Sequence, residues 1–495
     1  MLIVAALTAV GAALRLAVVQ QSLYADELST RLVVAGHGLG DVISIVHTDA
    51  EITPPLYFVA SWLTTRIDLT PEMLRAPSLI AGAAAIPLVY QLGMRTVGSR
   101  AALTAAALTT FSPFMVFYST EARGYELMIV LVLGSTLCLL TAVERGGVRW
   151  WAAYSVLACA AVYTHYTSVF ALGGQLCWLL VVHPEARRAG LVASSAAALG
   201  FLPWLSGLKI DLQSPTTDIL SALQPFTPGF VRANLVHWAI GYPEARSNTR
   251  VGVLPGTPAL VALLLAGIVA CAGIVAAGLR GRLRLPDRRL ALVIVLAVSV
   301  PIAEAIASAI GSNLFGTRYL AASWPAFALC FAAFLVAAGP RLGIAAAVLA
   351  IGAFALGGIK MLDHDLRRPD FDGVVAFVVR TGAARDVVVD GVTGAPAGVP
   401  TTMDLGFAGH RRVFPIGRPA VRYDPFRILA APPPTADVVH RAAAAAAPSG
   451  RLFLLLEADG PLRTDAIAAV PPDYRRVAMR TYPGVTPISV LVFES

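Results

Sequence analysis

Charged residues and cysteines are scarce in this chain. Asp, Glu, Lys and Arg together make up 14% of the 495 residues, and lysine occurs only at Lys209 and Lys360. Apolar residues make up 57%, and the mean hydropathy is +0.71. So little charge excludes a soluble enzyme and is typical of a polytopic membrane protein with some aqueous mass attached.

The chain lacks the signals of disulfide-rich and of nucleic-acid-binding proteins. The five cysteines all lie in apolar runs, where cysteine packs as a small hydrophobic residue, so no disulfide framework is indicated. The net charge is +8, but no basic cluster is interleaved with aromatic residues, as a nucleic-acid site would require. The arginines fall mostly between apolar segments, which is typical of residues that orient membrane helices.

The first 20 residues resemble a signal peptide in hydrophobicity alone. They lack a basic start, and they contain Arg15 and Gln20 instead of a small-residue cleavage site. We therefore expect this segment to be the first membrane span.

A membrane-spanning helix needs roughly 20 apolar residues, and the chain has about eleven segments suited to this. The expected spans are residues 1–20, 77–95, 101–118, 125–143, 150–164, 167–183, 190–207, 256–279, 290–310, 319–338 and 342–359.

The arginines indicate which loops face the cytoplasm. If the N-terminus is cytoplasmic, the short loops on that side contain most of the arginines, in agreement with the positive-inside rule. Every polar motif that suggests a site then falls on the outer side. The outer segments are loop 21–76, link 119–124, the turn near residue 165, loop 208–255, link 311–318 and everything after residue 360.

The composition changes abruptly after Lys360, where charges and prolines become common. We expect residues 1–360 to form a transmembrane domain and residues 361–495 an aqueous α/β domain. This second domain shows no catalytic signature, and a lid or scaffold over the outer face is its expected role. The predicted strands are 386–390, 452–456 and 488–493, and the predicted helices are 371–381 and 436–447.

Asp26 and Glu27 form an adjacent acid pair at the outer end of the first span. Carboxylates are costly inside hydrocarbon, so a pair at this level is either solvated at the interface or part of a functional site. Neighbouring residues on a helix point about a third of a turn apart. We therefore expect different roles, with one acid facing a reaction centre and the other capping a helix or steadying the loop.

A second acid pair, Asp49 and Glu51, lies two residues apart in the same loop. In an extended segment both side chains point the same way, which suits a cation or a basic partner. Pro54 and Pro55 then stiffen the backbone ahead of an apolar helix that contains Tyr57. A simple interfacial turn is the alternative interpretation.

Two arginines and a histidine also lie at the outer membrane level. The fork of Arg123 or Arg318 suits bidentate binding of phosphate, although an isolated arginine there also reaches lipid headgroups. His165, taken alone, fits a structural role. Seven residues at one level instead indicate acids near a nucleophile and cations near an anionic leaving group: Asp26, Glu27, Asp49, Glu51, Arg123, His165 and Arg318.

Seven motifs follow in order along nearly the whole chain: YADELS at 24–29, TPPLYF at 53–58, LRAPSL at 74–79, SPFMVFYSTEARGYEL at 112–127, YTHYTSVF at 163–170, LPWL at 202–205 and TRYL at 317–320. This set resembles the GT-C superfamily of integral membrane glycosyltransferases, in particular the branch related to protein O-mannosyltransferases and the aminoarabinose transferase of lipid A. The family usually has a histidine before the two prolines. Here that position is Thr53, and His47 is a candidate spatial substitute.

The resemblance implies transfer of a monosaccharide from a polyprenyl-phosphate donor to a hydroxyl of an extracytoplasmic acceptor, with inversion at the anomeric carbon. The acceptor is a glycan, a lipid or a protein. We expect a bacterial plasma membrane location, with the active site and the C-terminal domain outside the cytoplasm. A lipid-linked sugar needs no nucleotide cofactor, which agrees with the absence of a nucleotide-binding glycine loop.

The expected roles follow from this chemistry. A general base accepts the proton of the acceptor hydroxyl, and cations stabilise the charge that develops on the departing phosphate. A divalent cation (Mg²⁺, Mn²⁺ or Ca²⁺) at Asp49 and Glu51 is left open. The predicted residues are Asp26 as the base with Glu27 as a second catalytic candidate, Arg123, Arg318 and His165 for the phosphate, and Asp49, Glu51 and Tyr57 for the acceptor or a metal.

Two alternatives stay open. A lipid or small-molecule transporter (flippase) would have discontinuous helices and polar residues at the membrane midplane, where this chain has mostly Ala, Leu and Val apart from Glu304. A noncatalytic scaffold would use the aqueous domain to bind a partner. The abundance of Ala, Val, Arg and Pro favours a high-GC bacterium, and for an actinobacterial envelope the expected donor is mannose or arabinose on a decaprenyl carrier.

Overall fold

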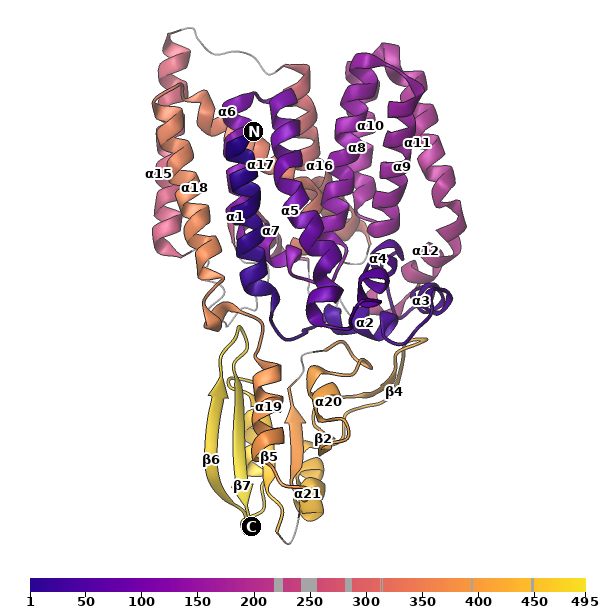
Figure 1. Ribbon diagram of the computed structural model, residues 1–495, viewed down its shortest axis with the longest axis vertical. Coiled ribbons are helices and arrows are strands. Elements are labelled where there is room, and N and C mark those ends of the chain that lie inside the picture. Colours follow the sequence, from indigo (N-terminus) through magenta and orange to yellow (C-terminus); the bar gives the residue numbers. More distant parts are fainter. Residues whose placement is uncertain are drawn as a thin grey trace.

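The structure, a computed structural model, describes residues 1–217, 226–241, 256–280, 287–311, 313, 315–392, 395–446 and 449–495. A bundle of long helices is followed in the chain by a sheet with helices packed on it (Figure 1). This confirms an α-helical polytopic membrane protein with a small C-terminal α/β domain. Within the expected loop 208–255, residues 218–225 and 242–255 lie outside the described residues, and the described part includes helix α14 (Pro228–Ile240).

Eight helical segments in the described part of the chain are long and apolar enough to cross a membrane, and a bent pair makes a possible ninth span. The eight are α1 (Leu2–Val19), α5 (Pro71–Thr96), α8 (Tyr125–Arg145), Pro184–Leu212 with α11 (Arg187–Phe201) and α12 (Leu205–Leu212), α15 (Thr257–Leu279), α16 (Arg288–Ile310), Thr317–Ala337 with η4 (Thr317–Ser323) and α17 (Trp324–Ala337), and α18 (Leu342–Lys360).

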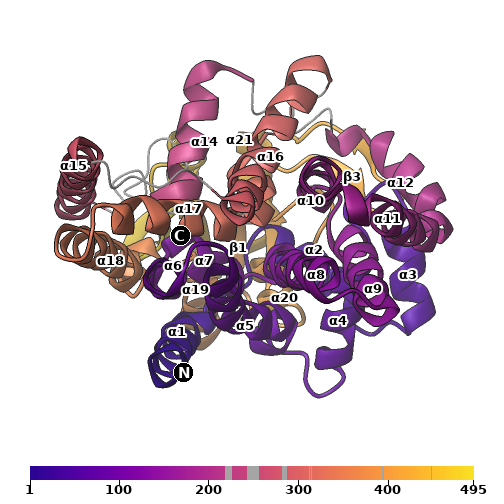
Figure 2. The ribbon, with the colours of Figure 1, turned by 90° about the horizontal axis from the view of Figure 1, so that it is seen from above.

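The predicted number of eleven spans is not confirmed. Two of the expected spans form shorter helices, α9 (Val148–Thr164) with 17 residues and α10 (Ser168–Val182) with 15. A helix of 15 residues is only about 22 Å long, against roughly 30 Å of hydrocarbon. Both still pack in the bundle beside α8 and α11 (Figures 1 and 2).

The bent pair consists of α6 (Ser99–Phe111) and α7 (Pro113–Ser119), which meet at an angle of 57°. Pro113 has no N–H to donate and so cannot continue the hydrogen-bond ladder of α6. Ser112 starts the new helix, because its hydroxyl accepts a hydrogen bond from the Met115 N–H at 3.3 Å. The break directs α7 and the link after it toward the outer end of the bundle.

The first outer loop folds into three short helices, α2 (Asp26–Val34), α3 (Leu39–Val46) and α4 (Leu56–Thr65). They lie at the end of the bundle that faces the C-terminal sheet (Figure 1). Their buried apolar side chains form one cluster, which also includes Tyr423 from the C-terminal part of the chain.

The C-terminal sheet has the strand order β2-β1-β5-β7-β6. β1 (Val387–Gly391) runs parallel to β2 (Arg412–Pro415) and β5 (Leu452–Glu457), whereas β7 (Ile488–Glu494) is antiparallel to β5 and β6 (Arg475–Tyr482). The predicted strands coincide with β1, β5 and β7, which are buried. The sequence did not indicate β2 and β6, because neither strand is buried along its length and neither shows an apolar run.

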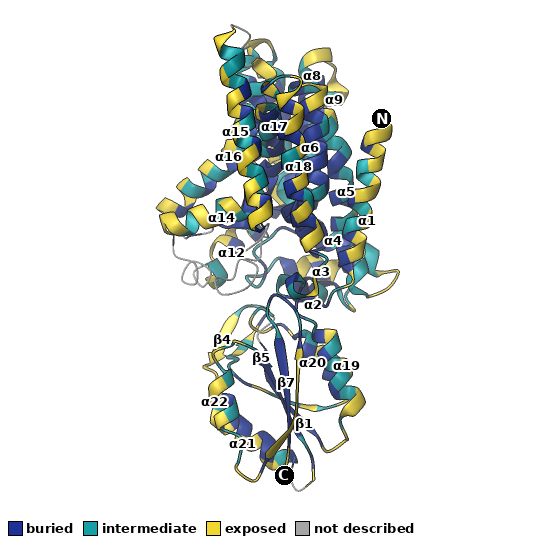
Figure 3. Ribbon diagram, turned by 90° about the vertical axis from the view of Figure 1, so that its left-hand side faces the viewer, coloured by how far each residue is buried: buried dark blue, intermediate teal, exposed yellow. Residues whose placement is uncertain are grey.

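Helices cover both faces of this sheet. α19 (Phe371–Thr381) and α20 (Thr402–Phe407) pack on one face, and α21 (Thr435–Ala446) and α22 (Arg463–Ala468) pack on the other. Figure 3 shows the central strands buried between them. A separate antiparallel hairpin of β3 (Ala420–Arg422) and β4 (Arg427–Ala430) lies beside the first loop.

Hydrogen bonds join the C-terminal domain to the segment just before Asp26. The Gln21 side chain accepts from the Arg368 N–H at 2.8 Å, and the Thr402 hydroxyl donates to the Leu23 carbonyl at 2.7 Å. Two points of the C-terminal domain therefore hold the segment that leads into α2.

Candidate active site

A cavity of about 470 Å³ lies where the first loop, link 119–124, the turn at residue 165, the start of η4 and the C-terminal domain meet. Five of the predicted site residues line this one cavity: Asp26, Glu51, Arg123, His165 and Arg318. Glu27, Asp49 and Tyr57 are not among its lining residues.

Asp26 is the first residue of α2 and faces the cavity. Ala25 before it has φ +51°, the only positive φ at a non-glycine residue in the described part of the chain, so the backbone turns sharply here. The Asp26 carboxylate accepts a hydrogen bond from Arg318 Nη1 at 2.5 Å. Burial acts to raise the pKa of Asp26, but the charges of Arg318 and Arg123 outweigh it and hold the pKa below its usual value. Asp26 is therefore ionised at neutral pH.

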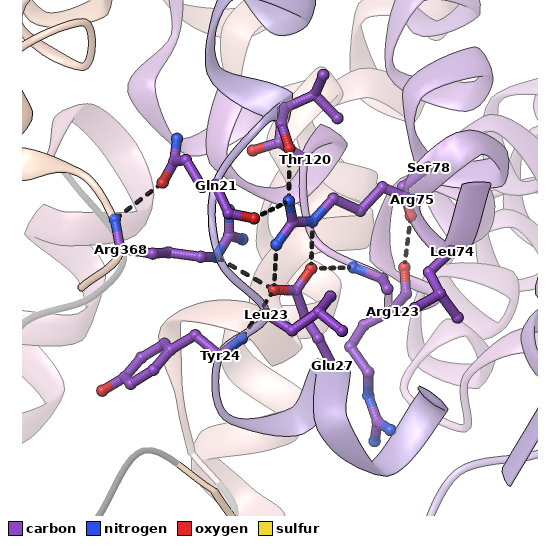
Figure 4. Close-up of polar contacts among 12 residues, drawn as sticks. Gln21, Leu23, Tyr24, Glu27, Leu74, Arg75, Ser78, Thr120, Arg123 and Arg368 are labelled. Atoms are coloured by element: carbon purple, nitrogen blue, oxygen red, sulfur yellow. Dashed lines mark hydrogen bonds and ion pairs between the residues drawn. The ribbon is translucent and has the colours of Figure 1, made fainter. Parts of the chain in front are cut away.

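Glu27 points the other way, into a buried ion-pair cluster (Figure 4). Its two carboxylate oxygens accept from Arg75 at 2.6 and 2.7 Å, and one of them also accepts from the Ala122 N–H at 2.9 Å. Arg368 approaches within 3.4 Å. Burial acts to raise the pKa of Glu27, but Arg368 and Arg75 lower it below its usual value. Glu27 therefore steadies the loop, which is one of the two roles expected for this pair of neighbouring acids.

Arg123 forms an ion pair with Glu51 at 3.1 Å and lies 3.4 Å from the Thr53 hydroxyl. Its side chain points away from the Glu27 cluster (Figure 4). Burial acts to lower the pKa of Arg123, but Glu51 and Asp26 raise it above its usual value, so the guanidinium keeps its charge. Thr53, where the resembled family has histidine, thus contacts the predicted phosphate-binding arginine.

His165 lines the cavity, and its hydrogen bonds fix the position of its ring proton. Its Nδ1 accepts from the Thr167 N–H at 3.3 Å, and since a backbone N–H can only donate, the proton of a neutral ring must sit on Nε2. Nε2 is buried and has no hydrogen-bond partner among the described residues. Burial, with Arg123 and Arg318 nearby, lowers the pKa of His165 to about 3, so the ring is neutral at physiological pH.

Asp49 and Glu51 do not form a shared site. The Asp49 carboxylate accepts from the Phe426 N–H at 2.8 Å, whereas both oxygens of Glu51 are occupied, one by Arg123 and the other by the Tyr423 hydroxyl. No group of three or more His, Cys, Asp or Glu side chains within the described ranges is arranged to hold a metal ion. The donor set around Asp49 and Glu51 therefore does not fit a divalent cation.

Tyr57 and His47 also lie away from the cavity lining. The buried Tyr57 hydroxyl donates to the Leu74 carbonyl at 3.0 Å, which ties α4 to α5. His47 Nε2 lies 2.9 Å from the Ser206 hydroxyl, so His47 does not take the place of the family histidine.

Several lining residues were not singled out from the sequence, among them Tyr125, Tyr319, Glu304 and Tyr423. Tyr125 and Tyr319 lie within the quoted motifs and flank the His165 ring, with ring centres 5.3 and 5.6 Å away. Glu304 also lines the cavity, although the sequence offered it only as the exception among apolar residues of the spans. Tyr423 had no signal, since nothing in the C-terminal segment indicated a site.

Parts of this chain are similar in sequence to known proteins. The family described as dolichyl-phosphate-mannose-protein mannosyltransferase matches residues 53–206. "Putative mannosyltransferase YycA" of Bacillus subtilis (strain 168) is 27% identical over 168 residues, which are 34% of this chain and 24% of that protein. The chain thus spans about a quarter of the length of this relative.

The solved structures extend the likeness to the fold. The archaeal oligosaccharyltransferase AglB from Archaeoglobus fulgidus aligns over 94% of this chain and 70% of its own, with a TM-score of 0.55 and 13% identity. ArnT from Cupriavidus metallidurans aligns over 99% of this chain and 97% of its own, with a TM-score of 0.45 and 12% identity. This chain has the GT-C fold. The likeness to AglB confirms the GT-C resemblance expected from the motifs at the level of the fold.

The Glu27 cluster predicts a large loss of stability when its anion is removed. Glu27→Gln leaves Arg75 buried without a counter-charge, and breaking such a pair typically costs ~3–5 kcal/mol. We expect a clear drop in the thermal unfolding midpoint in detergent. The neighbouring Asp26→Asn is the matched control and should lower the midpoint much less, because Asp26 and Arg318 are partly exposed. Equal midpoints for the two variants would contradict the structural role of Glu27.

The environment of His165 predicts that it stays neutral across the physiological range. Its folded pKa of about 3 lies below the unfolded value, so the unfolded chain binds more protons and His165 destabilises the fold as pH falls through the unfolded pKa. In ¹⁵N-histidine spectra the His165 signals, assigned by their loss in His165→Asn, should not titrate between pH 5 and 8. A midpoint near 6.5 would refute this environment.

Proposed function

We propose that this protein is an inverting glycosyltransferase that moves a monosaccharide from a polyprenyl-phosphate donor to a hydroxyl of an extracytoplasmic acceptor. One observation carries the proposal: an ionised carboxylate, Asp26, and two arginines, Arg123 and Arg318, line the same cavity. These groups match the two ends of such a reaction, at which a proton leaves the acceptor and negative charge develops on the donor phosphate.

Asp26 is the general base in this proposal. It takes the proton of the acceptor hydroxyl as that oxygen bonds to the anomeric carbon of the sugar. The bond between the anomeric carbon and the phosphate oxygen breaks, and its electron pair leaves with the lipid phosphate. A single displacement of this kind inverts the anomeric centre. Lowering of the pKa by Arg318 and Arg123 keeps Asp26 ionised and ready to accept the proton.

The phosphate gains one negative charge when the sugar leaves. Arg123 and Arg318 supply two permanent positive charges, and the neutral ring of His165 lines the same cavity. Preorganised donors of this kind stabilise developing charge without reorganisation at the moment of reaction.

The donor class has support from a protein of the same fold, since the AglB structure is a complex with an inhibitory peptide and a dolichol-phosphate. We propose a bacterial plasma membrane location with the cavity on the extracytoplasmic side. The support comes from the end of the bundle opposite the cavity, where Glu144 pairs with Arg95 at 2.6 Å and with Arg289 at 3.2 Å. Arginines gather at the cytoplasmic ends of membrane helices, so this end should face the cytoplasm.

Replacement of the base provides the direct test. In reconstituted vesicles with labelled polyprenyl-phosphate mannose or arabinose, Asp26→Asn should lower kcat by about 10²–10⁴ and leave the donor bound. Asp68→Asn, an exposed acid of the same loop, is the matched control and should transfer sugar at the wild-type rate. A wild-type kcat in Asp26→Asn would refute the assignment of Asp26 as the general base. Movement of intact donor across the membrane, without release of polyprenyl phosphate, would instead identify a transporter.

Binding of the leaving lipid can be tested without turnover. Polyprenyl phosphate should raise the thermal unfolding midpoint of the wild type. At a concentration of 100 times its Kd, the lipid should stabilise the folded protein by about 2.7 kcal/mol. The double variant Arg123→Gln/Glu51→Gln removes the cation and its buried partner together, and it should bind at least about tenfold more weakly, a loss of ~1.4 kcal/mol.

The control for this measurement is Arg95→Gln/Glu144→Gln. It removes an Arg–Glu ion pair that is more exposed and lies at the opposite end of the bundle, and it should leave binding unchanged. An equal loss in both double variants would place the lipid phosphate elsewhere.

A further inference from the structure

A side chain of the C-terminal domain reaches the predicted phosphate site. Tyr423 follows β3 in the hairpin and is 8% exposed. Its hydroxyl donates to Glu51 Oε1 at 2.5 Å and shares a second hydrogen bond of 2.9 Å with the Ser29 hydroxyl. Burial and the charge of Glu51 raise the pKa of Tyr423 well above its usual value, so the hydroxyl keeps its proton.

Glu51 links this hydroxyl to Arg123. Its Oε1 accepts from Tyr423 while its Oε2 accepts from Arg123 Nη1 at 3.1 Å, and Glu51 itself is 3% exposed. The hairpin is fixed to the same segment a second time, because the Phe426 N–H donates to the Asp49 carboxylate at 2.8 Å. A continuous hydrogen-bonded chain thus runs from the C-terminal domain to the arginine.

The geometry of Glu51 decides how strongly it competes for Arg123. A guanidinium and a carboxylate bind most tightly through two parallel hydrogen bonds. Oε1 of Glu51 is turned toward the Tyr423 hydroxyl, and only Oε2 contacts Arg123, so the ion pair is not bidentate. A phosphate that approaches Arg123 therefore competes with a single charge-assisted contact, instead of with a bidentate pair.

We propose that Tyr423 is a positioning residue that controls donor binding by holding Glu51 in this one-oxygen contact with Arg123. The C-terminal domain thereby completes the site of the lipid phosphate. This inference rests on the proposed function and adds to it a role for a part of the chain in which the sequence shows no catalytic signature.

Tyr423→Phe tests the inference, since it removes only the hydroxyl. With Oε1 released, Glu51 can bind Arg123 with both oxygens, and we expect the KM for the polyprenyl-phosphate donor to rise about tenfold, in line with a lost hydrogen bond to a charged group, while kcat stays within about twofold. Tyr474→Phe is the matched control, because Tyr474 is a buried tyrosine of the same domain whose hydroxyl donates to the Ala443 carbonyl at 2.9 Å. It should leave both constants unchanged.

A double variant separates positioning from a general structural effect. If Tyr423 acts through Glu51, adding Tyr423→Phe to Glu51→Gln should leave the donor KM of the Glu51→Gln enzyme unchanged. A further tenfold rise in that background, or an effect of Tyr474→Phe as large as that of Tyr423→Phe, would overturn the inference.

Failure of the proposed function has a different signature. If the wild type transfers no sugar from any donor of the panel, that proposal fails, and the same variants are then compared by the thermal shift with polyprenyl phosphate. Weaker binding in Tyr423→Phe alone supports the Tyr423–Glu51–Arg123 chain, and equal binding in all variants removes it.

Discussion

The buried ion pair between Glu27 and Arg75 is the contact on which the geometry of the cavity depends. Both side chains are fully buried, so neither charge can be left alone without a large cost. The same carboxylate also accepts from the Ala122 N–H. Asp26 directly precedes Glu27, and Arg123 directly follows Ala122. The buried Glu27 carboxylate therefore holds two segments of the chain. One carries the proposed base and the other carries the proposed phosphate-binding arginine.

The two arginines that line the cavity each have a carboxylate partner. Arg318 pairs with Asp26, and Arg123 pairs with Glu51, so each cation has an anion that lowers the cost of its burial. In the proposed reaction the donor phosphate takes over these arginines. Arg318 then no longer competes with the acceptor proton for Asp26, so donor binding strengthens the base at the moment when it is needed.

The sequence predicted residues whose positions are set by the membrane. Asp26, Arg123, His165 and Arg318 adjoin helical segments, so topology alone brings them to one level, and the structure places all four in one cavity. Which loop acid reaches the cavity was less predictable. Asp49 and Glu51 both contact the β3–β4 hairpin, through Phe426 and Tyr423, but only Glu51 lines the cavity. Tyr423 meets Glu51 across 372 residues of sequence, and no local pattern indicates such a contact.

The part that the C-terminal domain plays at the cavity follows from its sheet topology. β1, β2 and β5 are parallel, so their carboxyl ends lie along one edge, where ligand-binding loops of open α/β sheets converge. Residues 395–397 after β1 and the hairpin after β2 both contribute to the cavity lining, so this edge faces the membrane bundle. Crossover helices α20 and α21 cover the sheet faces, which leaves the connections at the edge free to carry site residues on a rigid support. Because these connections supply one wall, the enclosed cavity exists only when both parts of the chain are folded and docked.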